Sequence, residues 1–191
     1  MNMIKLVAKI LLCGDGAVGK TALRERYLGG SFSPTYLMTI GADFAVKEIN
    51  LTVDDEEYSI KGSIWDLAGQ VNFQHVRALY YKGAHAMIMV YDTTTRASFV
   101  NIDKWIAEIT SKGTNLTDLA VVLIGNKIDI REDIPEHIST AEGEQKAKEL
   151  SEQFCSGRTV YFLETSAKTG ENVEEAFATM GKRFVEMRNA E

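Results

Sequence analysis

An eight-residue segment near the N-terminus has the residue types and spacing of a phosphate-binding loop. It reads Gly14-Asp15-Gly16-Ala17-Val18-Gly19-Lys20-Thr21 and fits the pattern G-x-x-x-x-G-K-[ST]. Its glycines let the backbone curl so that successive N–H groups point inward at an anion, and the dipole of the following helix adds to the attraction. We expect Lys20 to reach the β- and γ-phosphates of a nucleotide and the Thr21 hydroxyl to bind Mg²⁺. The residues expected to contact the nucleotide here are Asp15, Gly16, Ala17, Val18, Gly19, Lys20, Thr21 and Ala22.

A phosphate loop alone is compatible with a kinase, an ATPase, a GTPase or a transporter subunit, and a later segment narrows the choice. Asp66 follows a strand-like pattern over residues 58–65, and an acid at a strand end can complete the Mg²⁺ shell of such an enzyme. Gly69 then offers a backbone N–H to a γ-phosphate. Gln70 offers an amide that both donates and accepts hydrogen bonds, which suits it to orient an attacking water. We therefore expect Lys20, Gly69 and Gln70 to take part in catalysis.

A third segment, Asn126-Lys127-Ile128-Asp129, has the residue types needed to select a base. The Asp129 carboxylate only accepts hydrogen bonds, so it suits guanine, which offers N1–H and a 2-amino group side by side. Adenine offers neither there, and discrimination by unpaired polar groups reaches about 10⁴-fold or more. Lys127 can lay its methylene stem along the base plane, and Ala167 can add a backbone N–H. The expected base-binding residues are Asn126, Lys127, Asp129, Ser166, Ala167 and Lys168.

The elements that must hold these segments alternate between short apolar runs and amphipathic runs. Runs rich in Val, Ile, Leu and Met predict buried parallel strands, and they cover residues 6–12, 86–91, 120–124 and 160–163. Apolar spacings of three and four predict helices over 99–109 and 173–184, and Ser139 begins a capping-box pattern that predicts another. Alternating units of this kind predict an α/β, doubly wound sheet with helices on both faces and ligands at the carboxyl ends of its strands.

One stretch departs from this rhythm and predicts an antiparallel hairpin. Phe44 and Val46 alternate along the chain, and then Ile49, Leu51 and Val53 alternate on the opposite parity, which predicts a β-bulge near Lys47-Glu48. Residues 54–57 predict the turn. The predicted fold is therefore that of a P-loop NTPase, a six-stranded, mostly parallel sheet with one antiparallel edge strand.

Composition limits the class of protein and of partner. At 191 residues we expect a single domain over residues 1–191. The formal net charge of −6 argues against nucleic acid as a partner, since phosphate backbones require clustered Lys and Arg. The two cysteines, Cys13 and Cys155, lie in apolar surroundings and suggest reduced core residues, although a buried disulfide stays open. No apolar run is long enough to span a membrane, and the N-terminus does not resemble a signal peptide, so we expect a cytoplasmic protein.

These motifs together resemble those of small GTPases of the Ras superfamily, and their sequences are most similar to those of the Rab family. The resemblance runs from about Lys5 to Met187. It includes Thr39-Ile40-Gly41-Ala42-Asp43-Phe44, Trp65-Asp66-Leu67-Ala68-Gly69-Gln70, Tyr80-Tyr81-Lys82-Gly83-Ala84-His85 and Glu164-Thr165-Ser166-Ala167-Lys168. The resemblance implies that Thr39 joins Thr21 and Asp66 on Mg²⁺, that Phe32 packs against guanine and that Tyr36 lies over the phosphates.

The resemblance also implies partners. Residues around 32–40 and 67–80 correspond to two switch segments that GTP orders and hydrolysis releases. GTPase-activating proteins, exchange proteins and effectors are therefore expected to bind through residues 32–44 and 67–81 of a monomer. Val71-Asn72 stands where Rab proteins carry an acidic and then a basic residue, so contacts of the second switch are expected to differ.

The C-terminal residues form a further departure, because Rab proteins normally end in a tail with prenylated cysteines and none is evident in this chain. Either a tail was removed, in which case the protein is expected to be peripheral at membranes, or the protein uses no covalent lipid anchor. The sequence leaves both open.

The function predicted from these residues is a Mg²⁺-dependent GTPase switch. No arginine is evidently placed to act in cis, so hydrolysis of GTP to GDP is expected to be slow without an activating partner. One alternative is a nucleotide-dependent interaction module with vestigial hydrolysis, which the intact Gly16, Thr39 and Gln70 oppose. Another is an ATPase or kinase, which Asp129 opposes.

Overall fold

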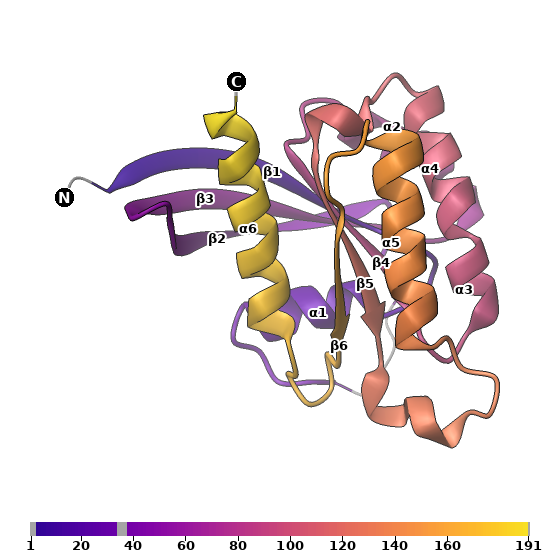
Figure 1. Cartoon of the computed structure of the whole chain (residues 1–191). Helices are drawn as coiled ribbons and strands as arrows, with labels where there is room; N and C mark the ends of the chain where they lie inside the picture. The colour runs from indigo at the N-terminus through magenta and orange to yellow at the C-terminus, as the bar shows by residue number, and fades with distance from the viewer. Residues whose placement is uncertain (1–2, 34–37, 191) are drawn as a thin grey trace.

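Six strands form one mixed sheet in the computed structural model, which describes residues 3–33 and 38–190 (Figure 1). The strand order is β2-β3-β1-β4-β5-β6, with β2 antiparallel to β3 and the other pairs parallel. The strands are β1 (Ile4–Cys13), β2 (Ala42–Val53), β3 (Glu56–Leu67), β4 (Ala86–Asp92), β5 (Ala120–Asn126) and β6 (Tyr161–Thr165). The predicted fold class is confirmed, with β2 as the antiparallel edge strand.

Helices cover both faces of this sheet (Figure 1). One face packs on α1 (Lys20–Tyr27) and α6 (Val173–Asn189), whose rings Tyr27 and Phe177 stack with centroids 3.8 Å apart. The other face packs on α2 (Gln74–Tyr81), α4 (Ile102–Ser111) and α5 (Thr140–Phe154). The short elements are α3 (Arg96–Val100) and the 3₁₀ helices η1 (Val71–Phe73), η2 (Leu116–Asp118) and η3 (Ile128–Asp133).

The predicted bulge at Lys47-Glu48 is wrong, because β2 and β3 pair in one unbroken register from Ala42↔Leu67 to Val53↔Glu56. The change of parity has another cause. Phe44 and Val46 lie on one face of β2 and are about half exposed, whereas Ile49 and Val53 on the opposite face are buried in the cluster that contains α6. Different faces of one strand are thus apolar at its two ends.

The hairpin turn is also tighter than residues 54–57 predicted. Asp54 and Asp55 alone form it, with φ values of 50° and 65°, and Glu56 already pairs in the sheet. Two central residues with positive φ match the twist of the flanking strands. The predicted helix over 99–109 is observed as α3 and α4, separated at Asn101, and the predicted capping box at Ser139 is confirmed.

The parallel arrangement determines where the chemical motifs meet. β1, β3, β4, β5 and β6 run in the same direction, so their carboxyl ends lie at one edge of the sheet. The phosphate loop follows β1, Asp66 lies near the end of β3 and Asn126 ends β5. All three motifs therefore lie at the edge where such sheets bind ligands.

Candidate functional site

The phosphate loop depends on two glycines that no other residue can replace. Gly14 has a φ of 137°, and a Cβ there would lie 2.1 Å from the Val90 carbonyl oxygen. Gly19 has a φ of 101°, and a Cβ there would lie 2.3 Å from the Asn126 side-chain nitrogen. Ala17 also has a positive φ, of 64°, a backbone conformation that residues other than glycine rarely adopt. The loop is thus held in the curled form that exposes backbone N–H groups to an anion.

Lys20 lies under this loop with its ammonium group bound to backbone oxygens. Its Nζ donates to the carbonyls of Gly14 and Asp15, both at 2.7 Å, and the residue is 6% exposed. Burial lowers the pKa of Lys20 to about 8, although the nearby carboxylate of Asp66 opposes the shift. A phosphate in the loop would favour the charged form, because an opposite charge raises the pKa of an ammonium.

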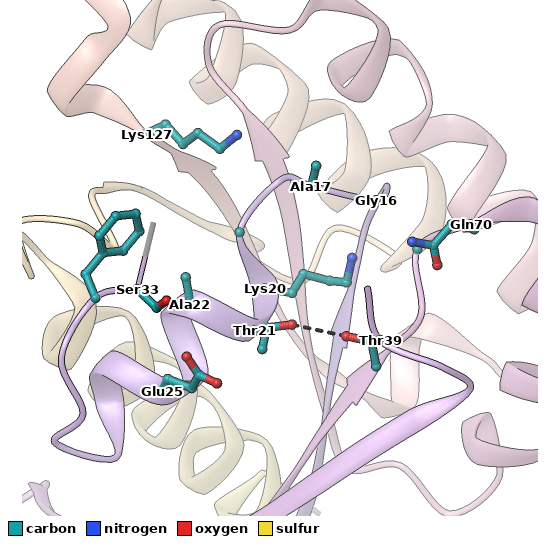
Figure 2. A pocket seen from close by; sticks show the side chains of 13 residues that line it. Gly16, Ala17, Lys20, Thr21, Ala22, Glu25, Ser33, Thr39, Gln70 and Lys127 are labelled. Carbon is teal, nitrogen blue, oxygen red and sulfur yellow. Dashed lines mark hydrogen bonds between the residues drawn. The ribbon is translucent and has the colours of Figure 1, made fainter. Parts of the chain in front are cut away.

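Three side-chain oxygens converge beside Lys20 from three segments. Thr21 Oγ1 donates to Asp66 Oδ2 at 2.5 Å, and it lies 3.2 Å from Thr39 Oγ1 (Figure 2). Thr39 Oγ1 in turn lies 3.4 Å from the same carboxylate oxygen. The other oxygen, Asp66 Oδ1, is buried and has no hydrogen-bond partner in the part of the chain described. Burial raises the pKa of Asp66, so a cation at this point would relieve a real electrostatic cost.

This donor set fits a hard divalent cation. Hydroxyl and carboxylate oxygens are the ligands that Mg²⁺ prefers, and Mg²⁺ usually takes only one or two carboxylates and completes its shell with waters and phosphate oxygens. A single buried carboxylate with two hydroxyls, next to a phosphate loop, matches that preference. Thr21, Thr39 and Asp66 therefore can hold Mg²⁺.

Gly69 lies directly against the phosphate loop. A Cβ at this position would lie 2.3 Å from both the Asp15 carbonyl carbon and the Gly16 nitrogen. Only glycine permits so close an approach of two backbones. Gly69 and Gln70 both line the pocket at the phosphate end, and Figure 2 shows Gln70 on the wall beside Gly16.

Asn126 joins three segments of the base end rather than facing the pocket itself. Its Nδ2 donates to the Val18 carbonyl at 2.9 Å, and its Oδ1 accepts from Thr165 Oγ1 at 3.0 Å and from the Ala167 N–H at 3.1 Å. The residue is 1% exposed. The Ala167 N–H is thus already hydrogen-bonded, so it can reach a base only by sharing or exchanging that bond.

Asp129 is held in place by its neighbours at the base end. Ser166 Oγ donates to Asp129 Oδ1 at 2.6 Å, and Lys168 Nζ lies 3.7 Å from Oδ2. Lys127 has a left-handed backbone, with φ of 71°, and its Nζ pairs with Asp92 at 2.6 Å. The predicted base-binding residues therefore do form one cluster.

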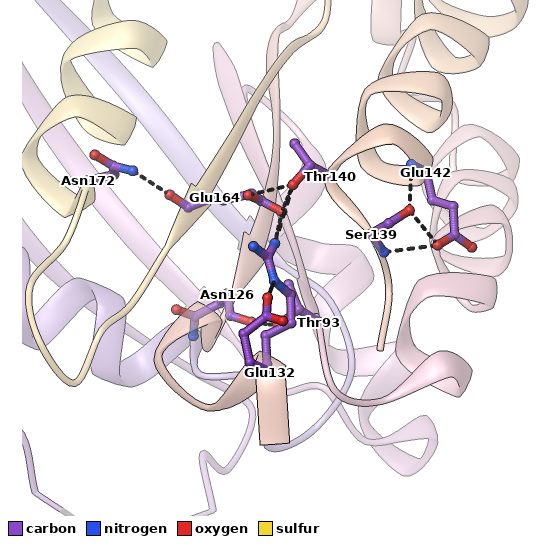
Figure 3. A network of polar contacts seen from close by, with 9 residues as sticks. Thr93, Asn126, Glu132, Ser139, Thr140, Glu142, Glu164 and Asn172 are labelled. Carbon is purple, nitrogen blue, oxygen red and sulfur yellow. Dashed lines mark hydrogen bonds and ion pairs between the residues drawn. The ribbon is translucent and has the colours of Figure 1, made fainter. Parts of the chain in front are cut away.

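A second layer of polar contacts supports the segment that carries Asp129. Arg131 on η3 pairs with Glu164 on β6, and Thr140 at the start of α5 donates to the same carboxylate at 3.0 Å (Figure 3). Thr93 Oγ1 donates to the Asn126 carbonyl at 3.1 Å. These contacts tie η3 to β6 and α5, and the end of β5 to the residue after β4, and so restrict the position of Asp129.

The pocket enclosed by these groups has a volume of about 250 Å³. The predicted residues that line it are Gly16, Ala17, Gly19, Lys20, Thr21, Ala22, Phe32, Thr39, Gly69, Gln70 and Lys127. Tyr36 lies outside the described residues. The remaining predicted residues lie behind these or at the base end, and they are Asp15, Val18, Asp66, Asn126, Asp129, Ser166, Ala167 and Lys168.

Sequence reasoning missed two residues that line the pocket, Glu25 and Ser33. Glu25 lies one helical turn after Thr21, so the i, i+4 spacing on α1 could have identified it. Ser33 belongs to no motif, and only its position next to Phe32 in the sequence could have indicated it.

The side chain of Asp15 points away from the pocket. Its carboxylate accepts from Asn101 Nδ2 at 2.6 Å and from the Trp105 indole N–H at 2.9 Å. Trp105 lies within the helix predicted over residues 99–109 from its apolar spacing. It is a core residue, 4% exposed, and it also anchors the phosphate loop to α4. The carboxylate of Asp15 is therefore occupied, and only its backbone faces the loop interior where a phosphate would bind.

Comparison with known proteins gives one consistent result. The sequence model of the Ras family matches residues 9–186. Ras-related protein Rab-26 of Homo sapiens is 39% identical over 177 residues, which cover 92% of this chain and 63% of that protein. Rab-30 of Homo sapiens is 37% identical, over 93% of this chain and 79% of its own length. Ras-related protein RIC1 of Oryza sativa is 40% identical, over 90% and 77% respectively. The chain thus spans just under two thirds of Rab-26.

Proposed function

The chain belongs to the Ras family of small GTPases, and from this premise we propose that it is a Rab-type guanine-nucleotide switch in membrane trafficking. The observation that carries the proposal is the convergence of the phosphate loop, the Thr21–Thr39–Asp66 oxygens and the Asn126–Asp129 segment at one edge of the sheet. Each of these alone occurs in other enzymes. Their combination around one pocket matches the three parts of a GTP–Mg²⁺ complex.

Hydrolysis in this pocket proceeds by attack of water on the γ-phosphate in line with the leaving oxygen. Lys20 stabilises the charge that develops on the phosphates, because its ammonium group has three N–H donors and only two are bound to the Gly14 and Asp15 carbonyls. The Gly69 N–H donates to a γ-phosphate oxygen, and the Gln70 amide orients the attacking water. The backbone N–H groups of residues 15–21 bind the remaining phosphate oxygens.

Thr21, Thr39 and Asp66 are the protein ligands that would hold Mg²⁺. When bound, Mg²⁺ neutralises charge on the β- and γ-phosphate oxygens. Because Thr39 belongs to the segment before β2, its hydroxyl links that segment to the occupied phosphate site. This link is how a bound γ-phosphate changes the shape of the surrounding surface.

Asp129 selects guanine by accepting hydrogen bonds from the ring N–H and the amino group. Lys127 packs along the base plane, Phe32 packs against its edge and Ala22 lies beneath it. Ser166 and Lys168 hold the Asp129 carboxylate in the accepting orientation, and Ala167 shares its N–H between Asn126 Oδ1 and the base.

The surface next to the pocket supports the proposal of regulator and effector binding through residues 32–44 and 67–81. Phe44 stacks on Trp65, and Trp65 packs on Tyr80, with centroids 4.9 and 5.2 Å apart. The largely exposed apolar side chains in these segments include Met38, Ile40, Phe44, Val71, Val76 and Leu79. Grouped apolar side chains on a polar protein are typical of a protein interface.

Among the described residues that line the pocket there is no arginine, so a partner's arginine accelerates turnover, typically by about 10³–10⁵-fold. The switch acts as a monomer in the cytoplasm, and in its GTP state it binds activating proteins and effectors. No helix in the described ranges is long and apolar enough to cross a bilayer.

Single-turnover hydrolysis of GTP tests the proposal. Purified protein is loaded with GTP, Mg²⁺ is added and phosphate release is followed in the wild type and in Gln70→Leu. We expect slow release from the wild type and at least tenfold slower release from the variant, with GDP affinity unchanged. Equal rates in the two proteins would refute the role of Gln70 and favour an interaction module with vestigial hydrolysis.

A further inference from the structure

A buried ion pair joins α2 to α4 directly behind the segment that carries Gly69 and Gln70. Arg77 on α2 is 4% exposed. Its Nε donates to Glu108 Oε1 at 2.8 Å and its Nη2 donates to Glu108 Oε2 at 2.5 Å, and its guanidinium lies 4.3 Å from the centre of the Trp105 ring. A guanidinium that is both bidentate and stacked is held in one orientation.

The third nitrogen of this guanidinium contacts the catalytic segment itself. Arg77 Nη1 donates to the Ala68 carbonyl at 3.2 Å and to the Gln70 carbonyl at 2.6 Å. These two carbonyls flank Gly69. Because the peptide bond is planar and trans, holding the Ala68 carbonyl also fixes the direction of the Gly69 N–H, which points away from Arg77.

The same helix α4 also anchors the phosphate loop. Asn101 and Trp105 bind the two carboxylate oxygens of Asp15, at 2.6 and 2.9 Å. Trp105 therefore contacts Asp15 through its N–H and Arg77 through its ring face. The two backbone segments that face the γ-phosphate site are thus both held by side chains that contact α4.

We propose that Arg77 is a positioning residue for GTP hydrolysis, one that aims the Gly69 N–H at the γ-phosphate and fixes the backbone from which Gln70 extends. This inference rests on the proposed function. Arg77 does not line the pocket, so it acts through Gly69 and Gln70 and not by touching the nucleotide. A purely structural ion pair would need only Glu108, and a buried pair by itself adds little stability. The two additional bonds to the backbone of residues 68–70 require a different reason.

Arg77→Lys tests the proposal, because an ammonium group keeps the charge but cannot bind Glu108 and both carbonyls in one fixed plane. Arg96→Lys is the matched control. Arg96 also pairs with a glutamate, Glu142, at 2.5 Å and lies 5.8 Å from the centre of the Phe99 ring, but it lies on α3 and does not line the pocket. Thermal unfolding of the GDP-bound proteins shows whether both variants fold.

Three quantities are measured for each protein: the single-turnover GTPase rate, the ratio of affinities for a non-hydrolysable GTP analogue and GDP, and the amide shift of ¹⁵N-labelled Gly69 with the analogue bound. For Arg77→Lys we expect a rate at least about tenfold lower and a ratio lowered by a similar factor, the equivalent of one lost hydrogen bond to a charged acceptor, together with a displaced Gly69 amide. For Arg96→Lys we expect all three within about twofold of the wild type.

The outcomes separate this inference from the proposed function. A wild-type rate and ratio in Arg77→Lys would overturn the positioning role, even while Gln70→Leu still slows hydrolysis at least tenfold. Equal loss of GDP and analogue affinity in Arg77→Lys would also overturn it, because only a structural role predicts that result. If the wild type itself failed to hydrolyse GTP, the proposed function would fail, and the affinity ratio and Gly69 amide would still decide the role of Arg77.

Discussion

Replacing Gly69 with alanine perturbs hydrolysis at the closest contact between the catalytic segment and the phosphate loop. The added Cβ would lie 2.3 Å from the Asp15 carbonyl carbon and the Gly16 nitrogen, about 1 Å inside normal packing distance. Both neighbours are backbone atoms of a loop held by Lys20 and Asn126, so the loop cannot yield. The segment with Gly69 must therefore move, and its N–H leaves the γ-phosphate. Loss of one such preorganised donor costs about 10²–10³-fold in rate.

The assay is phosphate release in a single turnover, together with GDP affinity, for Gly69→Ala. We expect the rate to fall by about 10²-fold and GDP affinity to stay within about threefold, since GDP lacks the γ-phosphate. Gly113→Ala is the control, because Gly113 has a φ of 82° and an added Cβ there would meet no atom within 4 Å. It adds a backbone strain that Gly69→Ala does not add and lies away from the site, so it shows whether a general loss of stability is enough to lower the rate. A Gly69→Ala rate within threefold of the wild type would show that the Gly69 N–H does not stabilise the γ-phosphate.

Two other predictions concern base selection and acid stability. Asp129→Asn replaces an acceptor of two charge-assisted hydrogen bonds, each worth about 1.5–3 kcal/mol. Fluorescence titration should therefore find GDP affinity about 10²–10⁴-fold weaker and xanthosine diphosphate affinity improved. Unchanged GDP affinity would exclude the guanine assignment. Hydrogen bonds from Arg96, and then from the N–H and hydroxyl of Ser139, lower the pKa of Glu142 to about 2. The charged Glu142 carboxylate therefore stabilises the fold above its unfolded pKa near 4.5, and this contribution disappears as the pH falls toward 2. Chemical denaturation should therefore find Glu142→Gln less stable by about 1 kcal/mol or less at pH 6, with the difference from the wild type vanishing near pH 2; a constant difference would contradict it.

The parts of the fold that were predictable are those in which local pattern and burial coincide. The strands β4 and β5 are buried throughout, so their unbroken apolar runs identified them, and the capping box at Ser139 is a local signal. The bulge was mispredicted because the alternation along the strand shows which residues are apolar but not which face of the strand is buried. The face that each end of β2 buries depends on α6, more than a hundred residues later.

The site divides in the same way. Motif residues were predictable because phosphate, cation and base each demand particular atoms in a particular order along the chain. The contacts that hold those motifs were not, because they join segments far apart in sequence. Trp105 has the spacing of a core residue, and nothing in its own helix indicates the bond to Asp15. Arg77 and Glu108, 31 residues apart, read separately as ordinary charged helix residues.

Hydrogen exchange of the amides in the GDP-bound and GTP-analogue-bound protein shows whether occupancy of the γ-phosphate site controls the adjoining surface. We expect slower exchange with the analogue in peptides covering residues 32–44 and 67–81, and little change in α5 or α6. Indistinguishable exchange of these two segments in the two nucleotide states would mean that the γ-phosphate does not control this surface.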